Sequence, residues 1–534
     1  MKDGTALDFS DRPGRFAALE TEMFDILVIG AGITGCGIAR DAAMRGLRTA
    51  LIDAGDIGSG TSSRSSKLIH GGLRYLAQGQ MGVVREAANE RRVLRRLAPH
   101  LSQTNPMVVL AGSKKSMAIL KTGLWTYEKM SKVDRHERHE SWKRKKLKEL
   151  EPAVCSENFE GAVVYPEYLT DDSRLTLANA RSAAAHGAVI LPYARAEQLT
   201  MENGKVVGAS VRGTLKSESL SATVRAKVVV NAAGPWVDAV RRMENPDAKA
   251  KLQLTKGIHL VFKKERLPFQ RSIVWNAPDR RGLFAVPRGE FVYIGTTDTF
   301  YADPEYWPQI TPEDVSYLMD SLNTILSGDP LTTADIVSTW SGIRPLLGTK
   351  GKKPSEISRR DEVIEGTGGL LSIAGGKLTS YRSMAVRMVD ICEKKTGKPH
   401  TPSTTAEEPL PGGDSAVSIN TLVEKVQELG LSIIDAERAV RLYGSEALEL
   451  FKSGGGPAVE AEYAVKVEGA LTLEDYWVRR SSRAYFDDNG GLDSLEPAAS
   501  VMATHLGWSD EERQEQIDTC RNQRATDMAL LNSL

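Results

Sequence analysis

Cysteine, long hydrophobic runs and net charge are all scarce in this chain. The four cysteines lie far apart and form no Cys-x-x-Cys pair, which argues against a zinc site, an iron–sulfur cluster or a disulfide framework. No run of about eighteen uncharged apolar residues occurs, and the first residues lack an apolar signal core. We therefore expect neither a membrane span nor secretion, and a reducing, cytoplasmic compartment fits these absences best.

An excess of positive or negative charge is also missing. Lys plus Arg and Asp plus Glu number 69 each, so no global field would recruit nucleic acid, and any anion site must be local. The 534 residues, 41% of them hydrophobic, exceed the size at which a single core stops growing. The chain should therefore fold into two or three domains.

The first strong motif is a glycine-rich turn between an apolar run and an alanine-rich stretch. Gly30, Gly32 and Gly35 form G-x-G-x-x-G after the run that ends at Ile29, and Asp53 closes the next apolar run. Such glycines allow a tight turn, the approach of backbone to a pyrophosphate and close helix–strand packing, while the acid can accept ribose hydroxyls. The pattern predicts a dinucleotide site but does not separate NAD from FAD.

Two later segments repeat the strand, glycine turn and helix pattern. The first, AKVVVNAAGPWVDAV (226–240), turns at Ala232 to Gly234, and the second, GLLSIAGGKLTSYRSMA (369–385), turns at Gly375 and Gly376. One nucleotide domain interrupted by insertions suits a long cofactor whose reactive ring lies far from its adenine, which favours a flavin. The alternative is that these segments only add strands to an ordinary nucleotide-binding sheet.

Several motifs, in order along the chain, make a resemblance specific. They are GTSSRSSKLIHGGLRYL, KGIHLVF, IGTTDTFY, WSGIRPLL and AGGKLTSYR. Together they resemble the FAD-dependent sn-glycerol-3-phosphate dehydrogenases of the quinone-reducing respiratory type, over residues 24–395. The resemblance implies an α/β fold with a Rossmann-like FAD-binding domain of glutathione-reductase type, an antiparallel-sheet substrate domain and a C-terminal α-helical domain.

The domain boundaries follow from the insertions and from a linker. We expect a discontinuous FAD-binding domain over 20–110, 200–250 and 350–395, and a substrate-binding domain over 111–199 and 251–349. Residues 394–414 are rich in Pro, Gly, Thr and charge and predict a linker before a C-terminal helical domain over 415–534. Within that domain 462–480 resembles the family, whereas RRSSRAYFDDNGGLDS (479–494) departs from its regular helical pattern, so the role of this segment is open.

The resemblance also assigns cofactor-binding residues. Beyond the three glycines of the first turn, Asp53, Ala232, Gly234, Gly375 and Gly376, it places along the FAD the residues Ser62, Ser63, Ser66, Lys67, Leu68, Lys377, Leu378 and Thr379. The cation of Lys377 would lie by the flavin ring and stabilise its reduced, anionic form.

Substrate phosphate needs fixed positive charge, and arginine offers a planar fork for two oxygens. Arg74 and Arg344 are the candidates, because each follows a glycine-containing turn and neither lies in a charge run. The resemblance makes substrate-binding residues of both, together with Tyr75, His259, Thr296, Thr297 and Lys377. His70 is as consistent with a structural role as with a substrate contact.

The expected reaction is oxidation of glycerol 3-phosphate to dihydroxyacetone phosphate. Hydride would pass from C2 to the flavin while a base accepts the hydroxyl proton. His259 is the first candidate for that base, with Arg344 and Lys377 completing the catalytic set, but Lys377 or a bound water could also take the proton. A membrane quinone is the expected acceptor, and no metal is required.

A membrane contact is the last expectation. Residues 116–132 carry apolar and interfacial side chains, and 144–148 (RKKLK) add a basic flank. We expect peripheral attachment to the inner face of the cell membrane through this region, with a packed helix beside a solvated face as the alternative. Whether the protein forms a homodimer is left open. Two rival functions stay in play: an amine or amino-acid oxidase of the same fold, and a non-catalytic flavin-binding protein.

Overall fold

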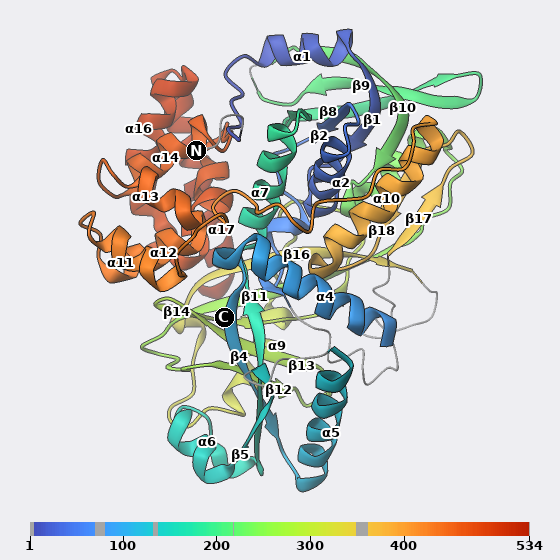
Figure 1. Ribbon diagram of the computed structural model, residues 1–534. Helices are drawn as coiled ribbons and strands as arrows, with labels where there is room; N and C mark the ends of the chain where they lie inside the picture. Colours follow the sequence, from blue (N-terminus) through green and yellow to red (C-terminus); the bar gives the residue numbers. More distant parts are fainter. Residues whose placement is uncertain (1–4, 70–80, 132–136, 217, 349–360, 533–534) are drawn as a thin grey trace.

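The computed structural model describes residues 5–69, 81–131, 137–216, 218–348 and 361–532. Two sheets lie one above the other, and the C-terminal helices lie beside the upper sheet and reach down to the lower one (Figure 1). Each sheet collects strands from separate stretches of the chain, so neither is continuous in sequence.

The upper sheet has a parallel centre. Its strand order is β17-β18-β10-β1-β2-β7, where β1 pairs in parallel with both β10 and β2, and an antiparallel extension joins β8 and β9 to β10. The strands are β1 (Met23–Ile29), β2 (Thr49–Ile52), β7 (Val189–Leu191), β8 (Ala194–Glu202), β9 (Lys205–Gly213), β10 (Ser221–Asn231), β17 (Glu362–Glu365) and β18 (Leu371–Ala374).

Burial on both faces explains the continuous apolar run of β1. Every residue of this strand after Met23 is buried. Helices α2 (Ile33–Met44), α7 (Asp172–Ala185) and α10 (Tyr381–Thr396) share one core with the upper sheet. A second core lies between the sheet, α1 (Arg12–Thr21), α8 (Val237–Glu244) and the β8–β9 hairpin. A strand covered on both sides has no polar face, as expected for a parallel sheet.

The lower sheet is antiparallel except for one parallel pair, β4 with β12. Its longest pairing joins β11 to β16, and its order is β15-β11-β14-β13-β12-β4-β6-β3. The strands are β3 (Leu68–Ile69), β4 (Gln103–Ala111), β5 (Glu140–Lys143), β6 (Gly161–Leu169), β11 (Leu252–Lys263), β12 (Ser272–Asn276), β13 (Gly282–Arg288), β14 (Phe291–Gly295), β15 (Thr299–Phe300) and β16 (Ile336–Leu347). Around them lie α4 (Met81–Leu97), α5 (Lys114–Ser131), α6 (Arg144–Leu150) and α9 (Pro312–Asn323).

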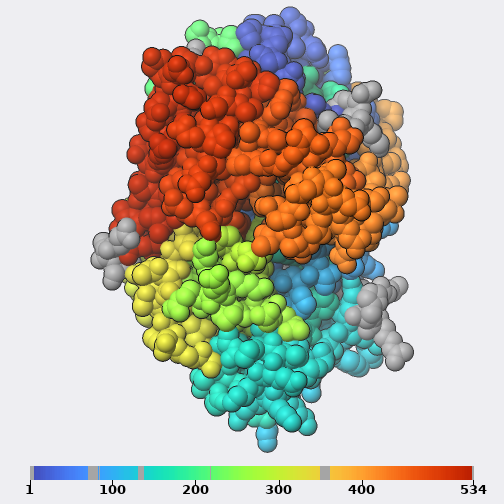
Figure 2. Space-filling view, turned by 90° about the vertical axis from the view of Figure 1, so that its left-hand side faces the viewer, coloured from blue at the N-terminus to red at the C-terminus, as the bar shows by residue number. Residues whose placement is uncertain are grey.

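The C-terminal part is helical. It contains a π-helix at Asp475–Arg480 and α11 (Ile419–Gln427), α12 (Ile433–Tyr443), α13 (Ala447–Leu450), α14 (Pro457–Lys466), α15 (Arg483–Phe486), α16 (Leu495–Leu506) and α17 (Asp510–Asn532). Its apolar residues pack against one face of the lower sheet, and its π-helix also meets α7 of the upper layer. In the space-filling view these helices, orange to red, rest on the lower layer over a wide front (Figure 2).

The predicted fold class is confirmed, with the parallel β4–β12 pair as an addition. Sheet membership crosses the predicted domain boundaries. Strand β4 of the lower sheet falls within the range expected for the FAD-binding domain, and β7 and β8 of the upper sheet begin within the range expected for the substrate domain. The boundaries stay a prediction, and we propose that they be drawn by sheet membership.

Candidate cofactor and substrate site

A cavity of about 410 Å³ lies at the carboxyl ends of the parallel strands β1, β2, β10 and β18. This is where open α/β sheets bind ligands. The predicted cofactor residues that line it are Gly30, Gly32, Asp53, Ser62, Ala232, Gly234, Gly375, Gly376, Lys377 and Leu378. The predicted cofactor residues outside its lining are Gly35, Ser63, Ser66, Lys67, Leu68 and Thr379.

The glycines of the first turn are there because side chains would not fit. Gly30 has φ +109°, and a Cβ there would lie 2.6 Å from the carbonyl oxygen of Ala232. A Cβ at Gly35 would overlap the carbonyl oxygen of Gly30, which explains why Gly35 belongs to the motif although it does not line the cavity. The turn brings bare backbone to the cavity, as a pyrophosphate requires.

The half-buried carboxylate of Asp53 is fixed by two backbone donors. Its Oδ2 accepts the N–H of Ala31 at 2.6 Å and its Oδ1 accepts the N–H of Gly55 at 2.8 Å. Burial raises the pKa of Asp53 to about 6, and the two N–H bonds offset part of that rise. A carboxylate held at the edge of the cavity can still accept ribose hydroxyls with its remaining lone pairs.

The loop after Asp53 closes over the start of α2. Ser62 Oγ accepts the N–H of Ile33 at 2.9 Å, and the segment from Ser59 to Ser62 lines the cavity. Glycine turns without Cβ atoms, a helix N-terminus, a fixed acid and an apolar-walled cavity together fit an adenine dinucleotide that carries a flavin.

His259 lies on β11 of the lower sheet, buried among aromatic rings. Its ring stacks on Trp340 with centroids 4.5 Å apart, and its Nε2 lies 3.0 Å from Ser66 Oγ. Burial first, and then the positive charges of Arg344 and Lys67, hold the pKa of His259 well below its usual range. A Cβ at Gly295 on β14 would overlap the imidazole, so this glycine makes the space for the ring. His259 is therefore a neutral imidazole at neutral pH.

Arg344 lies opposite Thr255 in the β11–β16 pairing. Its Nη2 donates to Thr296 Oγ1 at 2.8 Å and its Nη1 donates to the Thr297 carbonyl at 3.2 Å. Asp298 is 3.5 Å away, and a Cβ at Gly257 would overlap the guanidinium. The structure thus brings together Arg344, Thr296 and Thr297, three of the predicted substrate residues.

Two contacts join the substrate side to the cavity. Thr61 Oγ1 donates to the carbonyl of Ile343 at 2.6 Å, and Pro345, which follows Arg344 on β16, lines the cavity. Lys377 lines it as well, from the turn before α10. Strand β16, which carries Arg344, is therefore connected to the place where the cofactor would lie.

Some predicted residues have other contacts or cannot be placed. Arg74 and Tyr75, with His70, lie outside the described residues. Lys67 is buried, and its Nζ donates to Asp172 at 2.5 Å and to the Ser63 carbonyl at 3.1 Å, so it anchors the loop.

Sequence reasoning missed several contributors. These are Trp340 as the stacking partner of His259, Ser66 as its polar partner, Asp298 beside Arg344, and the space-making glycines Gly257 and Gly295. Only the glycines left a signal, because each sits in an otherwise bulky strand beside a predicted site residue.

One group of acidic and histidine side chains has ligand atoms close enough for a metal ion within the part of the chain that the structure describes: Asp390, Glu393 and His400. Arg45 already donates to Asp390 at 2.6 Å and to Glu393 at 3.0 Å. Since the guanidinium stands where a cation would bind, the group forms an ion-pair network.

Comparison with known proteins agrees with this geometry. The family model of FAD dependent oxidoreductases matches residues 25–382, and the model of the C-terminal domain of alpha-glycerophosphate oxidase matches residues 403–513. The chain is 39% identical over 516 residues to the aerobic glycerol-3-phosphate dehydrogenase of Staphylococcus aureus strain USA300, with 92% of each protein covered.

Solved structures give the same result. The glycerol-3-phosphate dehydrogenase from Bacillus halodurans complexed with FAD is 32% identical with a TM-score of 0.82, covering 98% of this chain and 99% of that one. The L-alpha-glycerophosphate oxidase from Mycoplasma pneumoniae with FAD bound has a TM-score of 0.57 at 15% identity, covering 73% and 100%, and shows a likeness of fold alone.

Proposed function

Because the chain belongs to the family of FAD-dependent glycerol-3-phosphate dehydrogenases, we propose that it oxidises sn-glycerol 3-phosphate to dihydroxyacetone phosphate and passes the electrons to a membrane quinone. The residues that line the cavity would hold FAD, which would supply the hydride acceptor for C2 of the substrate. The observation that carries the proposal is the cluster of His259, Arg344, Thr296 and Thr297, which the Thr61–Ile343 hydrogen bond and Pro345 connect to the cofactor cavity.

Arg344 is the proposed phosphate ligand. Its guanidinium is about one-fifth exposed, so part of the donor fork remains accessible, while Thr296 and the Thr297 carbonyl hold the rest in place. A planar fork can bind two phosphate oxygens at once, which a lysine cannot. Arg74 and Tyr75 would complete this end of the site, and Thr296 or Thr297 would donate to the substrate.

His259 is the proposed base for the C2 hydroxyl proton. A general base must be unprotonated at the working pH, and the buried imidazole meets that condition. Trp340 and Ser66 fix the orientation of the ring. Lys377 and a bound water remain alternatives for this role, and Lys377 would otherwise favour the reduced cofactor by its charge.

Peripheral membrane attachment rests on α5 and α6. Ile119 and Trp125 of α5 are 62% and 52% exposed, whereas Leu124 and Tyr127 of the same helix are buried. No helix among the described residues is long and apolar enough to span a bilayer. In α6 and its approach, Lys146 pairs with Glu140, so part of the basic charge is already neutralised. Exposed aromatic and aliphatic side chains beside basic ones favour an interfacial contact.

Anaerobic titration of the purified flavoprotein tests the reaction. Glycerol 3-phosphate should bleach the oxidised flavin spectrum, while glycerol and glycine-type amines should not. Bleaching by the amine alone would favour an amine or amino-acid oxidase. An unchanged spectrum with all three compounds would favour a non-catalytic flavin-binding protein. Turnover with a soluble dye but not with a quinone would remove the quinone from the proposal.

A further inference from the structure

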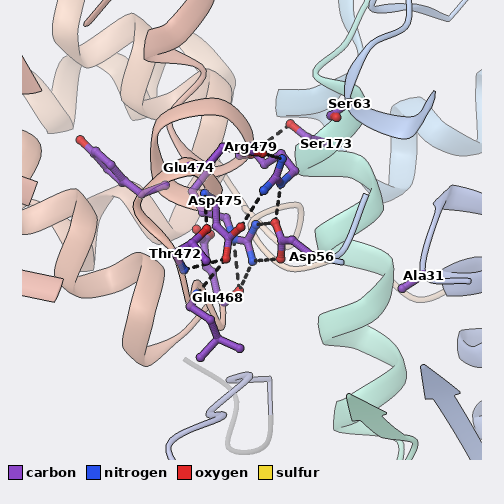
Figure 3. Close-up of polar contacts among 12 residues, drawn as sticks. Ala31, Asp56, Ser63, Ser173, Glu468, Thr472, Glu474, Asp475 and Arg479 are labelled. Atoms are coloured by element: carbon purple, nitrogen blue, oxygen red, sulfur yellow. Dashed lines mark hydrogen bonds and ion pairs between the residues drawn. The ribbon is translucent and has the colours of Figure 1, made fainter. Parts of the chain in front are cut away.

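A cluster of buried ions joins the C-terminal helices to the loop that lines the cofactor cavity. Asp56 lies in that loop and is buried, with both carboxylate oxygens engaged by arginines. Arg479 Nε donates to Asp56 Oδ2 at 2.5 Å, and Arg480 Nη2 donates to Oδ1 at 2.8 Å. Figure 3 shows Arg479 and Asp56 facing each other between the C-terminal helices and α7.

The backbone of the C-terminal domain is shaped for this contact. Successive side chains on an α-helix diverge by about 100°, yet two consecutive arginines reach one carboxylate here. They end the π-helix at Asp475–Arg480, and Ser482 just after it has φ +56°. The two arginines are the first residues of the stretch 479–494, whose sequence departs from the regular helical pattern.

The arginines are held on their own side as well. Arg479 donates to Glu474 at 2.7 Å and to Asp475 at 2.6 Å, and Arg480 donates to the carbonyl of Glu468 at 3.0 Å. Asp475 in turn accepts the hydroxyl of Tyr193 at 2.7 Å. Both guanidinium groups are therefore held by residues of their own domain as well as by Asp56, which makes the contact rigid.

Asp56 is at the centre of the loop whose other side faces the cofactor cavity. Ala54, Ser59, Gly60 and Thr61 line that cavity, and Asp56 does not. The Asp56 carbonyl accepts the N–H of Ser59 at 3.1 Å. A displacement of Asp56 would therefore move the residues on both sides of it, including Asp53.

We propose that Arg479 and Arg480 are positioning residues of the FAD site, which hold the cofactor-lining loop through Asp56 and make FAD retention depend on the C-terminal helical domain. The inference rests on the proposed placement of FAD along this loop.

Electrostatics point the same way. The negative charge of Asp56 raises the pKa of Asp53, and the positive charge of Arg479 lowers it. Cys36 and Tyr306 also face Asp53. Loss of Arg479 would raise the Asp53 pKa above its value of about 6. As the pH falls, Asp53 would then become protonated at a higher pH, and the carboxylate that accepts ribose hydroxyls would be lost earlier.

The test measures FAD affinity of the apoenzyme, by flavin fluorescence, for Arg480→Gln and Arg479→Gln. A matched control is Arg181→Gln, because Arg181 of α7 pairs with Glu446 of the same helical domain, at 2.7 and 2.8 Å, away from the loop. We expect both test variants to bind FAD about tenfold or more weakly than the control at equal thermal stability, since coupled contacts reach that size.

Two further measurements keep the test decisive. Arg480→Lys, which retains the charge, should recover part of the affinity, and Arg479→Gln should lose FAD at a higher pH than the unmodified chain. If a glutamine variant does not fold, Asp56→Asn replaces it. Equal FAD affinity in the test and control variants would overturn the inference. A protein that binds FAD as expected but is not reduced by glycerol 3-phosphate would contradict the proposed function and leave this inference standing. The two proposals can therefore fail separately.

Discussion

The upper-sheet side and the lower-sheet side of the site are built in opposite ways, the first by leaving side chains out and the second by particular side chains. On the upper sheet the cavity is shaped by glycine turns at Gly30, Gly375 and Gly376, where backbone rather than side chains lines the cavity. On the lower sheet His259 and Arg344 supply a ring and a charge. We therefore expect substitutions that add atoms to damage the upper-sheet side of the site, and substitutions that remove atoms to damage the lower-sheet side.

The largest effect is expected from one added methyl group on the upper side. Gly30→Ala should weaken FAD binding about 100-fold or more, because the positive φ costs about 1–3 kcal/mol and the Cβ meets the Ala232 carbonyl. The measurement is FAD retention after dialysis. Gly46→Ala is the control, since Gly46 has φ +75° but open space around it. Equal loss in both variants would attribute the effect to strain alone.

A removed charge on the lower side comes next. Arg344→Ala should raise KM for glycerol 3-phosphate about 30-fold or more while FAD stays bound, because truncating one partner of a buried charge contact costs about 2–5 kcal/mol. Steady-state kinetics with a soluble dye measure it. Arg266→Ala, which removes an exposed arginine paired with Asp335, is the control. Lost flavin with an unchanged KM would place Arg344 on the cofactor side.

A substitution at Lys377, which lines the cavity from the turn before α10, tests the region where the upper-sheet and lower-sheet sides of the site meet. Lys377→Met should lower the reduction potential of the flavin by about 30 mV, equivalent to about 1.4 kcal/mol for a two-electron couple, because a positive charge near the reduced ring is removed. Spectroelectrochemical titration of the two proteins gives the comparison. An unchanged potential would show that the lysine side chain does not act on the flavin.

The membrane contact is expected to give a smaller, several-fold effect on quinone reduction, because the catalytic site itself is left intact. Neutralising Lys143, Arg144, Lys145 and Lys146 should weaken sedimentation with anionic liposomes, since each cation near such a surface contributes about 1 kcal/mol and Lys146 is already paired. Quinone reduction should slow while turnover with a soluble dye is kept. Unaltered liposome binding would move the contact elsewhere.

The smallest effect is the change of rate with pH in the unmodified protein, which His259 would set. Its pKa is lowered, so the imidazole stays unprotonated as the pH falls to 6.5 and is lost as a base only below that. At saturating FAD, kcat/KM should be flat from neutral pH down to about 6.5. His259→Asn should remove the acidic limb along with most of the rate. A limb near pH 7 would argue for another base.

Sequence reasoning succeeded where a motif is contiguous. The turn at Gly30, Gly32 and Gly35, with Asp53 beyond it, predicted a nucleotide site, and Gly30, Gly32 and Asp53 line one cavity. Ser63, Ser66 and Lys67 share the loop but are not among the residues that line the cavity, and Lys67 and Ser66 have other polar partners, so their contact with FAD stays a prediction. Spacing along a loop does not tell which side chains face inward, because that depends on what packs behind it.

By itself, the sequence determined the cofactor class and the family and predicted which residues carry the chemistry, since backbone conformation and phosphate recognition are encoded in short stretches. Only the tertiary structure decided that Trp340 stacks on His259, which strand joins which sheet, and that Arg479 meets Asp56 across 423 residues of sequence. Such contacts leave no local pattern, because burial rather than sequence spacing brings the two ions together.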